Sequence, residues 1–143
     1  MSSGNVVVLD THVWLDVAMG RGQAFARRVV QKLDKAAAAG SLYVAAITPW
    51  EVASLARGGR IRVSSSVLEF IREALRETRT SVAPLDPSVA VDAVDLPGWE
   101  HRDPADRMIV ATARHLGAVL VTRDTAILEY AAGRKALRVL EPG

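Results

Sequence analysis

The chain has 143 residues, no cysteine and a net charge of only +2, although its pI is about 9.4. This length predicts one domain over residues 1–143, and the lack of cysteine excludes disulfides and thiolate zinc sites, so that any metal must be held mainly by oxygen. No apolar run approaches the roughly 20 residues that cross a bilayer, and the N-terminus lacks a basic signal-peptide region, so we expect no membrane association and a cytoplasmic location.

The first half of the chain alternates strand and helix patterns. A continuous β-branched run at 6–9 predicts a strand covered on both faces, which ends at Asp10. Thr48, followed by proline and then by Glu51, predicts a helix start with Thr48 as N-cap. In chain order, we expect a strand over 6–9, helices over 11–18 and 23–39, a strand over 42–45, and helices beginning at 48 and 66.

The second half continues the alternation. Asp103-Pro104 predicts a capped helix start, Gly117 suits the end of that helix, and the apolar run after it predicts a strand that leads into Asp124. The expected elements are a strand over 81–83, helices over 86–94 and 104–116, a strand over 118–122, a helix over 127–132 and a strand over 137–140. The alternation predicts an α/β fold, a three-layer α/β/α sandwich with a mainly parallel central sheet of about four to five strands.

Four acidic residues are expected at one edge of this sheet. Ligands of open α/β sheets bind outside the carboxyl ends of the strands, where Asp10 and Asp124 lie. Glu51 and Asp106 fall in first turns of helices that begin at the same edge. Except for Asp10, each has a competing interpretation as a helix cap: Asp124 as N-cap, Glu51 as the partner of Thr48, and Asp106 as the partner of Asp103.

A cluster of buried carboxylates is unfavourable by itself, because like charges repel and each group loses hydration. A divalent cation reverses that cost, and hard Mg²⁺ or Mn²⁺ prefers oxygen ligands. Near a phosphate such an ion activates water and neutralises the leaving oxygen, which is the chemistry of phosphodiester hydrolysis. Of the 18 basic residues, 15 are arginine, which suits a nucleic-acid substrate but equally reflects a G·C-rich genome.

Histidine and tryptophan residues add further candidates. His12 and His101 lie next to the acids in sequence, where they either orient ligands and contact phosphate or act as local hydrogen-bond donors. Trp14 and Trp50 are expected in the core. Trp99, in a loop, is the candidate for stacking on a base.

Together these residues resemble a PIN domain and, more narrowly, the VapC-type toxins of bacterial type II toxin–antitoxin pairs. The matching segments occur in the order of that family and span nearly the whole chain. They are Asp10–Leu15, Ile47–Ala53 with Gly59–Ile61, His101–Ala111, and Leu120–Asp124. The sequence departs from the family pattern at Thr48, where serine is common, at Ala105, where phenylalanine is common, and at Asp16, where an aromatic residue is common.

The resemblance implies a Mg²⁺- or Mn²⁺-dependent endoribonuclease that a cognate VapB-type antitoxin inhibits by placing a helix or extended segment, with an arginine, across the acid pocket. It also implies a homodimer and a toxin–antitoxin hetero-oligomer. The implied metal and catalytic residues are Asp10, Glu51, Asp106 and Asp124, with Glu51 binding directly or through water. Supporting roles near the metal fall on Asp103, Thr11, Thr122 and His12, and RNA contacts on Arg107, Arg123, Trp99 and His101.

Two alternatives stay open at the level of sequence. One is a catalytically degenerate PIN-fold module that binds RNA or a partner protein, against which the four retained acids argue. The other is an Asp-based phosphotransfer domain, which also places an aspartate after the first strand. The dehalogenase pattern has a second aspartate where this chain has His12, and no lysine follows a matching later strand.

Overall fold

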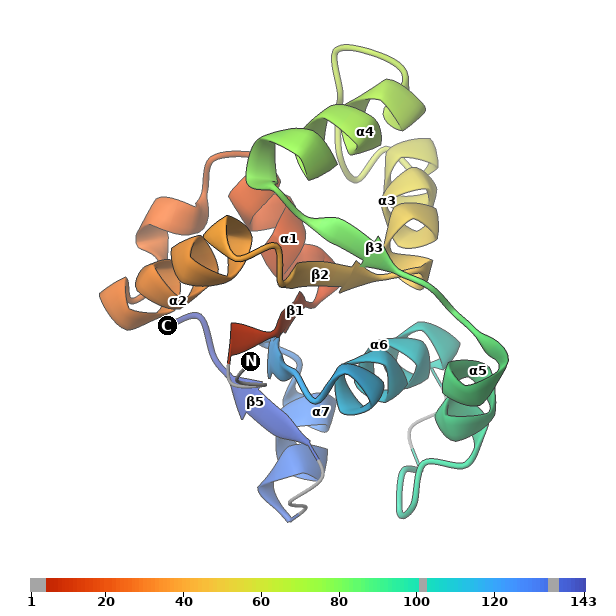
Figure 1. Cartoon of the computed structure of the whole chain (residues 1–143). Coiled ribbons are helices and arrows are strands. Elements are labelled where there is room, and N and C mark those ends of the chain that lie inside the picture. The colour runs from red at the N-terminus through yellow and green to blue at the C-terminus, as the bar shows by residue number, and fades with distance from the viewer. Residues whose placement is uncertain (1–4, 101–102, 134–136) are drawn as a thin grey trace.

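The computed structural model describes residues 5–100, 103–133 and 137–143. Its strands are β1 (Val7–Leu9), β2 (Leu42–Ala45), β3 (Ser81–Ala83), β4 (Val119–Val121) and β5 (Arg138–Leu140). They form one five-stranded sheet in the order β3-β2-β1-β4-β5, and every pairing is parallel (Figure 1). The predicted α/β class and parallel sheet are therefore confirmed.

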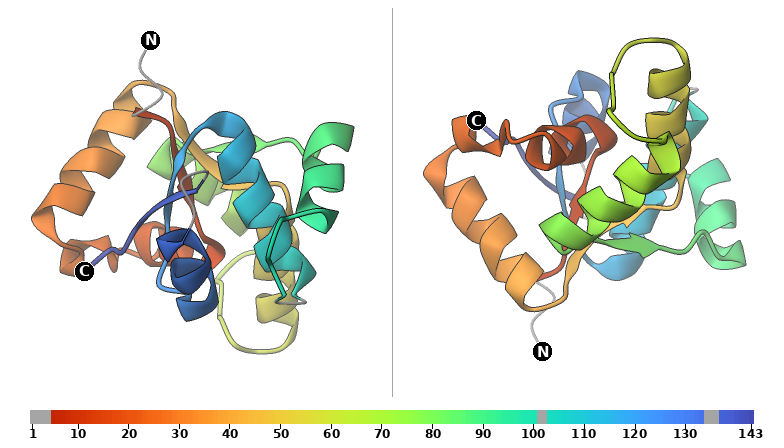
Figure 2. Two further views of the ribbon diagram at one scale, coloured as in Figure 1. Left: turned by 90° about the horizontal axis from the view of Figure 1, so that it is seen from below. Right: turned by 90° about the horizontal axis from the view of Figure 1, so that it is seen from above.

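Helices cover both faces of this sheet (Figure 2). They are α1 (Thr11–Ala18), the 3₁₀ turn η2 (Gly22–Ala24), α2 (Arg27–Ala38), α3 (Ile47–Arg57), α4 (Val67–Thr78), α5 (Pro87–Val94), α6 (Pro104–Leu116) and α7 (Thr125–Ala132). No helix in the described part of the chain is long and apolar enough to cross a membrane.

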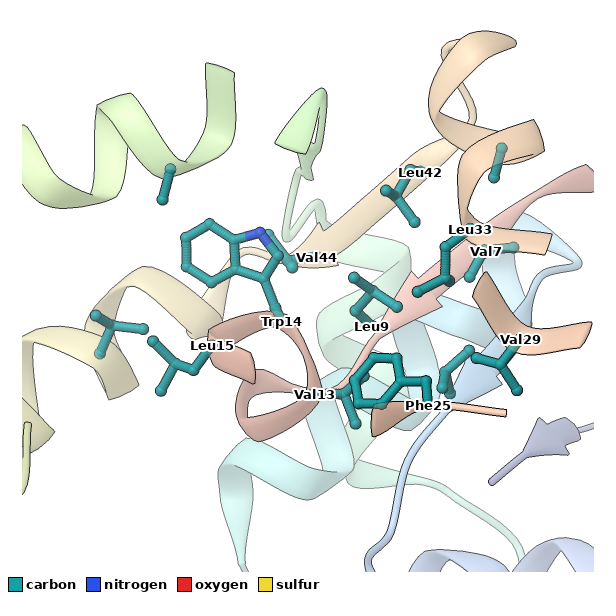
Figure 3. Close-up of a cluster of buried hydrophobic side chains, with 14 of the residues drawn as sticks. Val7, Leu9, Val13, Trp14, Leu15, Phe25, Val29, Leu33, Leu42 and Val44 are labelled. Atoms are coloured by element: carbon teal, nitrogen blue, oxygen red, sulfur yellow. The ribbon is translucent and has the colours of Figure 1, made fainter. Parts of the chain in front are cut away.

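Alternation along β1 divides the core into two layers. Val7 and Leu9 pack on one face with Trp14 of α1 and with side chains of α2 and α4, as Figure 3 shows for part of this cluster. Val8, which points the other way, packs with Ile109 of α6 and with side chains of β4 and α7. Because successive strand residues face opposite sides, an uninterrupted apolar strand requires helices on both faces.

The order of the strands places a switch point between β1 and β4. The chain runs from β1 outward to β2 and β3, and then crosses back to β4 and continues outward to β5. Leu9 pairs with Val121, and the backbone N–H of Asp10 donates to the carbonyl of Val121 at 3.0 Å. The residues that follow these two strands therefore diverge from adjacent positions, which in such sheets opens a crevice for ligands.

Three predicted helix boundaries are wrong, of which the simplest is α7, which begins at Thr125 and not at residue 127. The helix expected over 23–39 is split, because Phe25 (ψ 152°) and Ala26 (ψ 142°) are extended. The extension buries Phe25 in the core and lets the Ala26 N–H donate to the carbonyl of Pro142 at 2.8 Å. Thr48 is not an N-cap either, since α3 already begins at Ile47 and no side chain caps it.

Candidate active site

Asp10 occupies the switch point between β1 and β4. The residue is only 8% exposed, and each of its carboxylate oxygens accepts one hydrogen bond. The backbone N–H of Thr11 donates to Oδ1 at 2.8 Å, and the hydroxyl of Thr122 donates to Oδ2 at 2.6 Å. The carboxylate is thus fixed from two elements, and each oxygen keeps a lone pair for another ligand.

Thr11 links this carboxylate to a second one. Its hydroxyl donates to Oε1 of Glu51 at 2.5 Å and lies 2.9 Å from the hydroxyl of Thr48. A threonine hydroxyl has a single hydrogen, so when Thr11 donates to Glu51 it accepts from Thr48. Thr48 therefore supports Glu51 through Thr11 across two helices, and Glu51 is not the capping-box partner of Thr48.

Asp124 approaches Asp10 from the other side of the switch point. The hydroxyl of Thr122, which donates to Asp10, also accepts from the backbone N–H of Asp124 at 3.0 Å. Asp124 is in addition the N-cap of α7, with Oδ1 accepting from the N–H of Ile127 at 3.0 Å. The predicted capping role is real, and it places the acid beside Asp10 rather than excluding it from the site.

The two acids of α6 have different positions. Asp103 is the N-cap, and its Oδ1 accepts from the N–H of Ala105 at 2.9 Å. Asp106 lies in the first turn and is only 9% exposed. An aspartate buried to this degree is uncommon, which distinguishes Asp106 from an ordinary solvated first-turn acid.

Asp10 interacts electrostatically with Asp124, and Glu51 with Asp10 and Asp103. Burial raises the pKa of Asp10 above its ordinary value. The hydrogen bonds from Thr122 and Thr11 oppose this rise, and the negative charge of Asp124 adds to it. Burial likewise raises the pKa of Glu51, against the hydrogen bond from Thr11 and with repulsion from Asp10 and Asp103. The site therefore disfavours its own negative charge, which is the condition that a bound cation relieves.

A stability measurement should detect this unfavourable charge. In EDTA, the contribution of Asp10 to the stability of wild type should be lost as the pH rises from below 4 to 7, because a carboxyl whose pKa is raised by folding favours the folded state only while protonated. Asp10→Asn lacks the contribution of Asp10 and keeps that of Glu51, so the unfolding free energy of the variant relative to wild type should increase as the pH rises. Urea unfolding of both proteins at several pH values measures it.

Asp16→Asn is the matched control. Partial burial of Asp16 is outweighed by hydrogen bonds from Arg21 and Arg123, so that its pKa is lowered. The unfolding free energy of Asp16→Asn relative to wild type should therefore decrease as the pH rises. If the relative unfolding free energies of both variants changed in the same direction with pH, the assignment of an unfavourable negative charge to Asp10 would be contradicted.

The donor set fits a hard divalent cation, since it consists of carboxylate and hydroxyl oxygens with an unfavourable negative charge. Within residues 5–100, 103–133 and 137–143, no three acid or histidine side chains are yet close enough to bind one ion together. Glu51 is turned toward Thr11 and Asp124 toward the backbone of α7. Binding of one ion by all four acids therefore requires some of these side chains to move.

Of the predicted RNA contacts, the burial of Trp99 contradicts a stacking role, and Arg107 has partners within the protein. Trp99 is only 6% exposed and packs in the core against Tyr130, with ring centroids 4.7 Å apart, so it offers no face to a base. Arg107 points toward the protein, where its guanidinium donates to the carbonyls of Ala93, Val94 and Trp99. It ties the end of α5 to the loop before α6.

The remaining candidates divide into confirmed and changed positions. Trp14 is fully buried as expected, but Trp50 is 65% exposed and not in the core. His12 is exposed and lines a hollow of about 240 Å³ together with Asp10, Val13, Arg123 and Asp124. His101 lies outside the described residues.

Two residues near the site have structural roles that sequence patterns did not reveal. Thr48 was assigned a cap, yet its hydroxyl bonds to Thr11. Asp16 was noted only as a departure from the family pattern, yet it binds Arg123 beside the acids. Both contacts join residues far apart in sequence. The only indication of either contact in the sequence was the acidic residue at position 16, where the family commonly has an aromatic one.

Comparisons with known proteins agree with this fold. The family model described as the PIN domain matches residues 7–133. Ribonuclease VapC22 of Mycobacterium tuberculosis is 38% identical over 126 residues, which cover 87% of this chain and 91% of the relative. Among solved structures, VapBC2 from Rickettsia felis, bound to a DNA fragment from its promoter, covers 95% of this chain and 98% of its own with a TM-score of 0.68 and 12% identity. FitAcB from Neisseria gonorrhoeae covers 96% and 98% with a TM-score of 0.59 and 26% identity.

Proposed function

This chain belongs to the PIN domain family, and we propose that it is a metal-dependent endoribonuclease, the toxin of a VapBC-type toxin–antitoxin pair. The observation that carries the proposal is Asp10, buried at the β1/β4 switch point with both oxygens held and with Glu51 and Asp124 as charged neighbours. The name of the relative from Mycobacterium tuberculosis, a ribonuclease, supports the substrate class.

Asp10, Asp106 and Asp124 would hold Mg²⁺ or Mn²⁺, with Glu51 completing the set directly or through water. The ion supplies charge neutralisation at the phosphate and a more acidic water. Thr122 orients Asp10, and Thr11 orients both Asp10 and Glu51. Glu51, partly buried with a raised pKa, is suited to accept a hydrogen bond from the attacking water and then its proton.

Asp103 acts indirectly, through the helix that it caps and through its charge. It caps α6, the helix that carries Asp106, and its charge raises the pKa of Glu51. His12 counteracts part of this repulsion at the exposed rim of the hollow. Neither side chain is assigned to the metal.

The proposed partners follow from the family. A VapB-type antitoxin would block the acid hollow and neutralise its charge with an arginine. A homodimer of this chain would form the toxin half of a hetero-oligomer acting on cytoplasmic RNA. Exposed apolar side chains on α5, Val91 and Val94, are available to such an interface.

The function is tested with the purified chain, free of antitoxin and shown to be folded by circular dichroism. Cellular RNA incubated with Mg²⁺ or Mn²⁺ should be cut at few positions, and EDTA should stop the reaction. Sequencing of RNA ends after controlled expression then locates the cuts. Mg²⁺ at ten times its dissociation constant should also stabilise the fold by about 1.4 kcal/mol.

Two outcomes would contradict the proposal in different ways. Tight RNA binding without cleavage in any divalent metal would indicate a degenerate binding module. A stable acyl-phosphate on Asp10 after treatment with a phosphodonor would indicate a phosphotransfer domain.

A further inference from the structure

Asp16, near the end of α1, holds two arginines at once. Its Oδ1 accepts from Nε of Arg21 at 2.9 Å, and its Oδ2 accepts from Nη1 of Arg123 at 2.7 Å. One negative charge is thereby shared between two positive ones, and the group carries a net charge of about +1. It is a cationic group beside an anionic site.

Arg123 is also held by an aromatic ring. Its guanidinium carbon lies 5.3 Å from the ring centroid of Phe25, which is buried in the core. The extended backbone at Phe25 and Ala26, which divides η2 from α2, is what brings this ring into place. Cation–π contact and a charged hydrogen bond together restrict a side chain that would otherwise sample many rotamers.

The position of Arg123 relates it to the proposed chemistry. It lies between Thr122, which donates to Asp10, and Asp124. It lines the hollow of about 240 Å³ whose other walls include Asp10 and Asp124, and its side chain is 47% exposed. A guanidinium has five N–H donors, so the bond to Asp16 leaves donors for an oxygen-rich ligand entering this hollow.

We propose that Asp16 is a positioning residue, which fixes Arg123 at the rim of the acid hollow so that the guanidinium binds a phosphate of the RNA next to the one that is cut. This inference rests on the proposed ribonuclease function. The acids repel the RNA backbone, and a cation fixed beside them offsets that repulsion where the strand enters. Pre-ordering Arg123 removes the cost of ordering it on binding.

A contact with a neighbouring phosphate is the same before and during the reaction, so it acts on binding and not on the chemical step. Asp16→Asn should therefore raise KM for RNA about 3- to 10-fold, the cost of ordering one such side chain, with kcat changed by less than about twofold. In the Asp10→Asn background, which removes cleavage, fluorescence anisotropy should show RNA affinity weakened by the same factor.

Arg21→Ala is the matched control. It removes the other partner of Asp16 and leaves the contact between Asp16 and Arg123, so KM should stay within about twofold of wild type. In an Arg123→Ala background, Asp16→Asn should have no further effect on KM, because coupled residues give non-additive changes.

Three results would overturn the inference. The first is an unchanged KM in Asp16→Asn, and the second is a lowered KM, which would mean that Asp16 holds Arg123 away from the RNA. The third is an effect of Asp16→Asn on KM that persists in the Arg123→Ala background. All three presuppose that wild type cleaves RNA. Absence of cleavage in wild type would instead contradict the proposed function, and the anisotropy comparison would still report on Asp16.

Discussion

Asp10→Asn is expected to lower the rate of RNA cleavage at least about 1000-fold, equivalent to about 4 kcal/mol of transition-state stabilisation. Asparagine keeps the size of the side chain and the acceptor for the Thr11 N–H, but it removes the charge that a divalent cation requires. The measurement is single-turnover cleavage of a defined RNA at saturating Mg²⁺.

Asp34→Asn, on the exposed face of α2, is the matched control and should cleave at the wild-type rate. Asp106→Asn should show the same loss as Asp10→Asn. Both inactive variants should unfold cooperatively, and the Mg²⁺-induced rise in stability should be absent from Asp10→Asn. Full cleavage activity in both Asp10→Asn and Asp106→Asn would refute the metal mechanism.

Local signals in the sequence predicted much of the fold. The bounds of α6 agree with the structure because Asp103 caps one end, followed by proline, and Gly117 adopts the left-handed conformation at the other. The edge shared by Asp10 and Asp124 followed from the strand pattern alone, since parallel strands with alternating helices place their carboxyl ends together.

Predictions failed where a tertiary contact competes with a local preference. Thr48, proline and Glu51 have the spacing of a capping box, yet both side chains bond to Thr11 instead. The helical pattern over 23–39 continues through Phe25, but burying that ring requires an extended backbone. In both cases the competing partner lies on another element, and its distance in space cannot be read from the order of residues.

The tryptophans illustrate the same limit. Trp50 is apolar and helical, but it faces solvent, whereas Trp99 follows a turn in a loop and is nonetheless covered by Tyr130. Loop or helix position alone therefore did not decide burial. At the candidate site, Trp99 therefore has a structural role in place of the expected stacking role. Among the described residues that were predicted to contact RNA, only Arg123 lines the hollow.

Thr11→Val is expected to lower cleavage about 10- to 100-fold, the usual cost of removing a group that orients a metal site. Valine has the shape of threonine but no hydroxyl, so Glu51 loses a donor and Thr48 loses an acceptor. Because the hydrogen bond from Thr11 lowers the pKa of Glu51, its loss should raise that pKa further. The pH below which activity falls should then move upward.

Thr11→Ser is the control, because serine restores the hydroxyl without the methyl group, and it should recover both the rate and the pH profile. A purely structural role for Thr11 would lower stability in Thr11→Val but leave the pH profile unchanged. A fall in rate without any shift in the profile would therefore mean that Thr11 acts through packing. The same result would follow if Glu51 were not the group whose protonation limits the reaction at low pH.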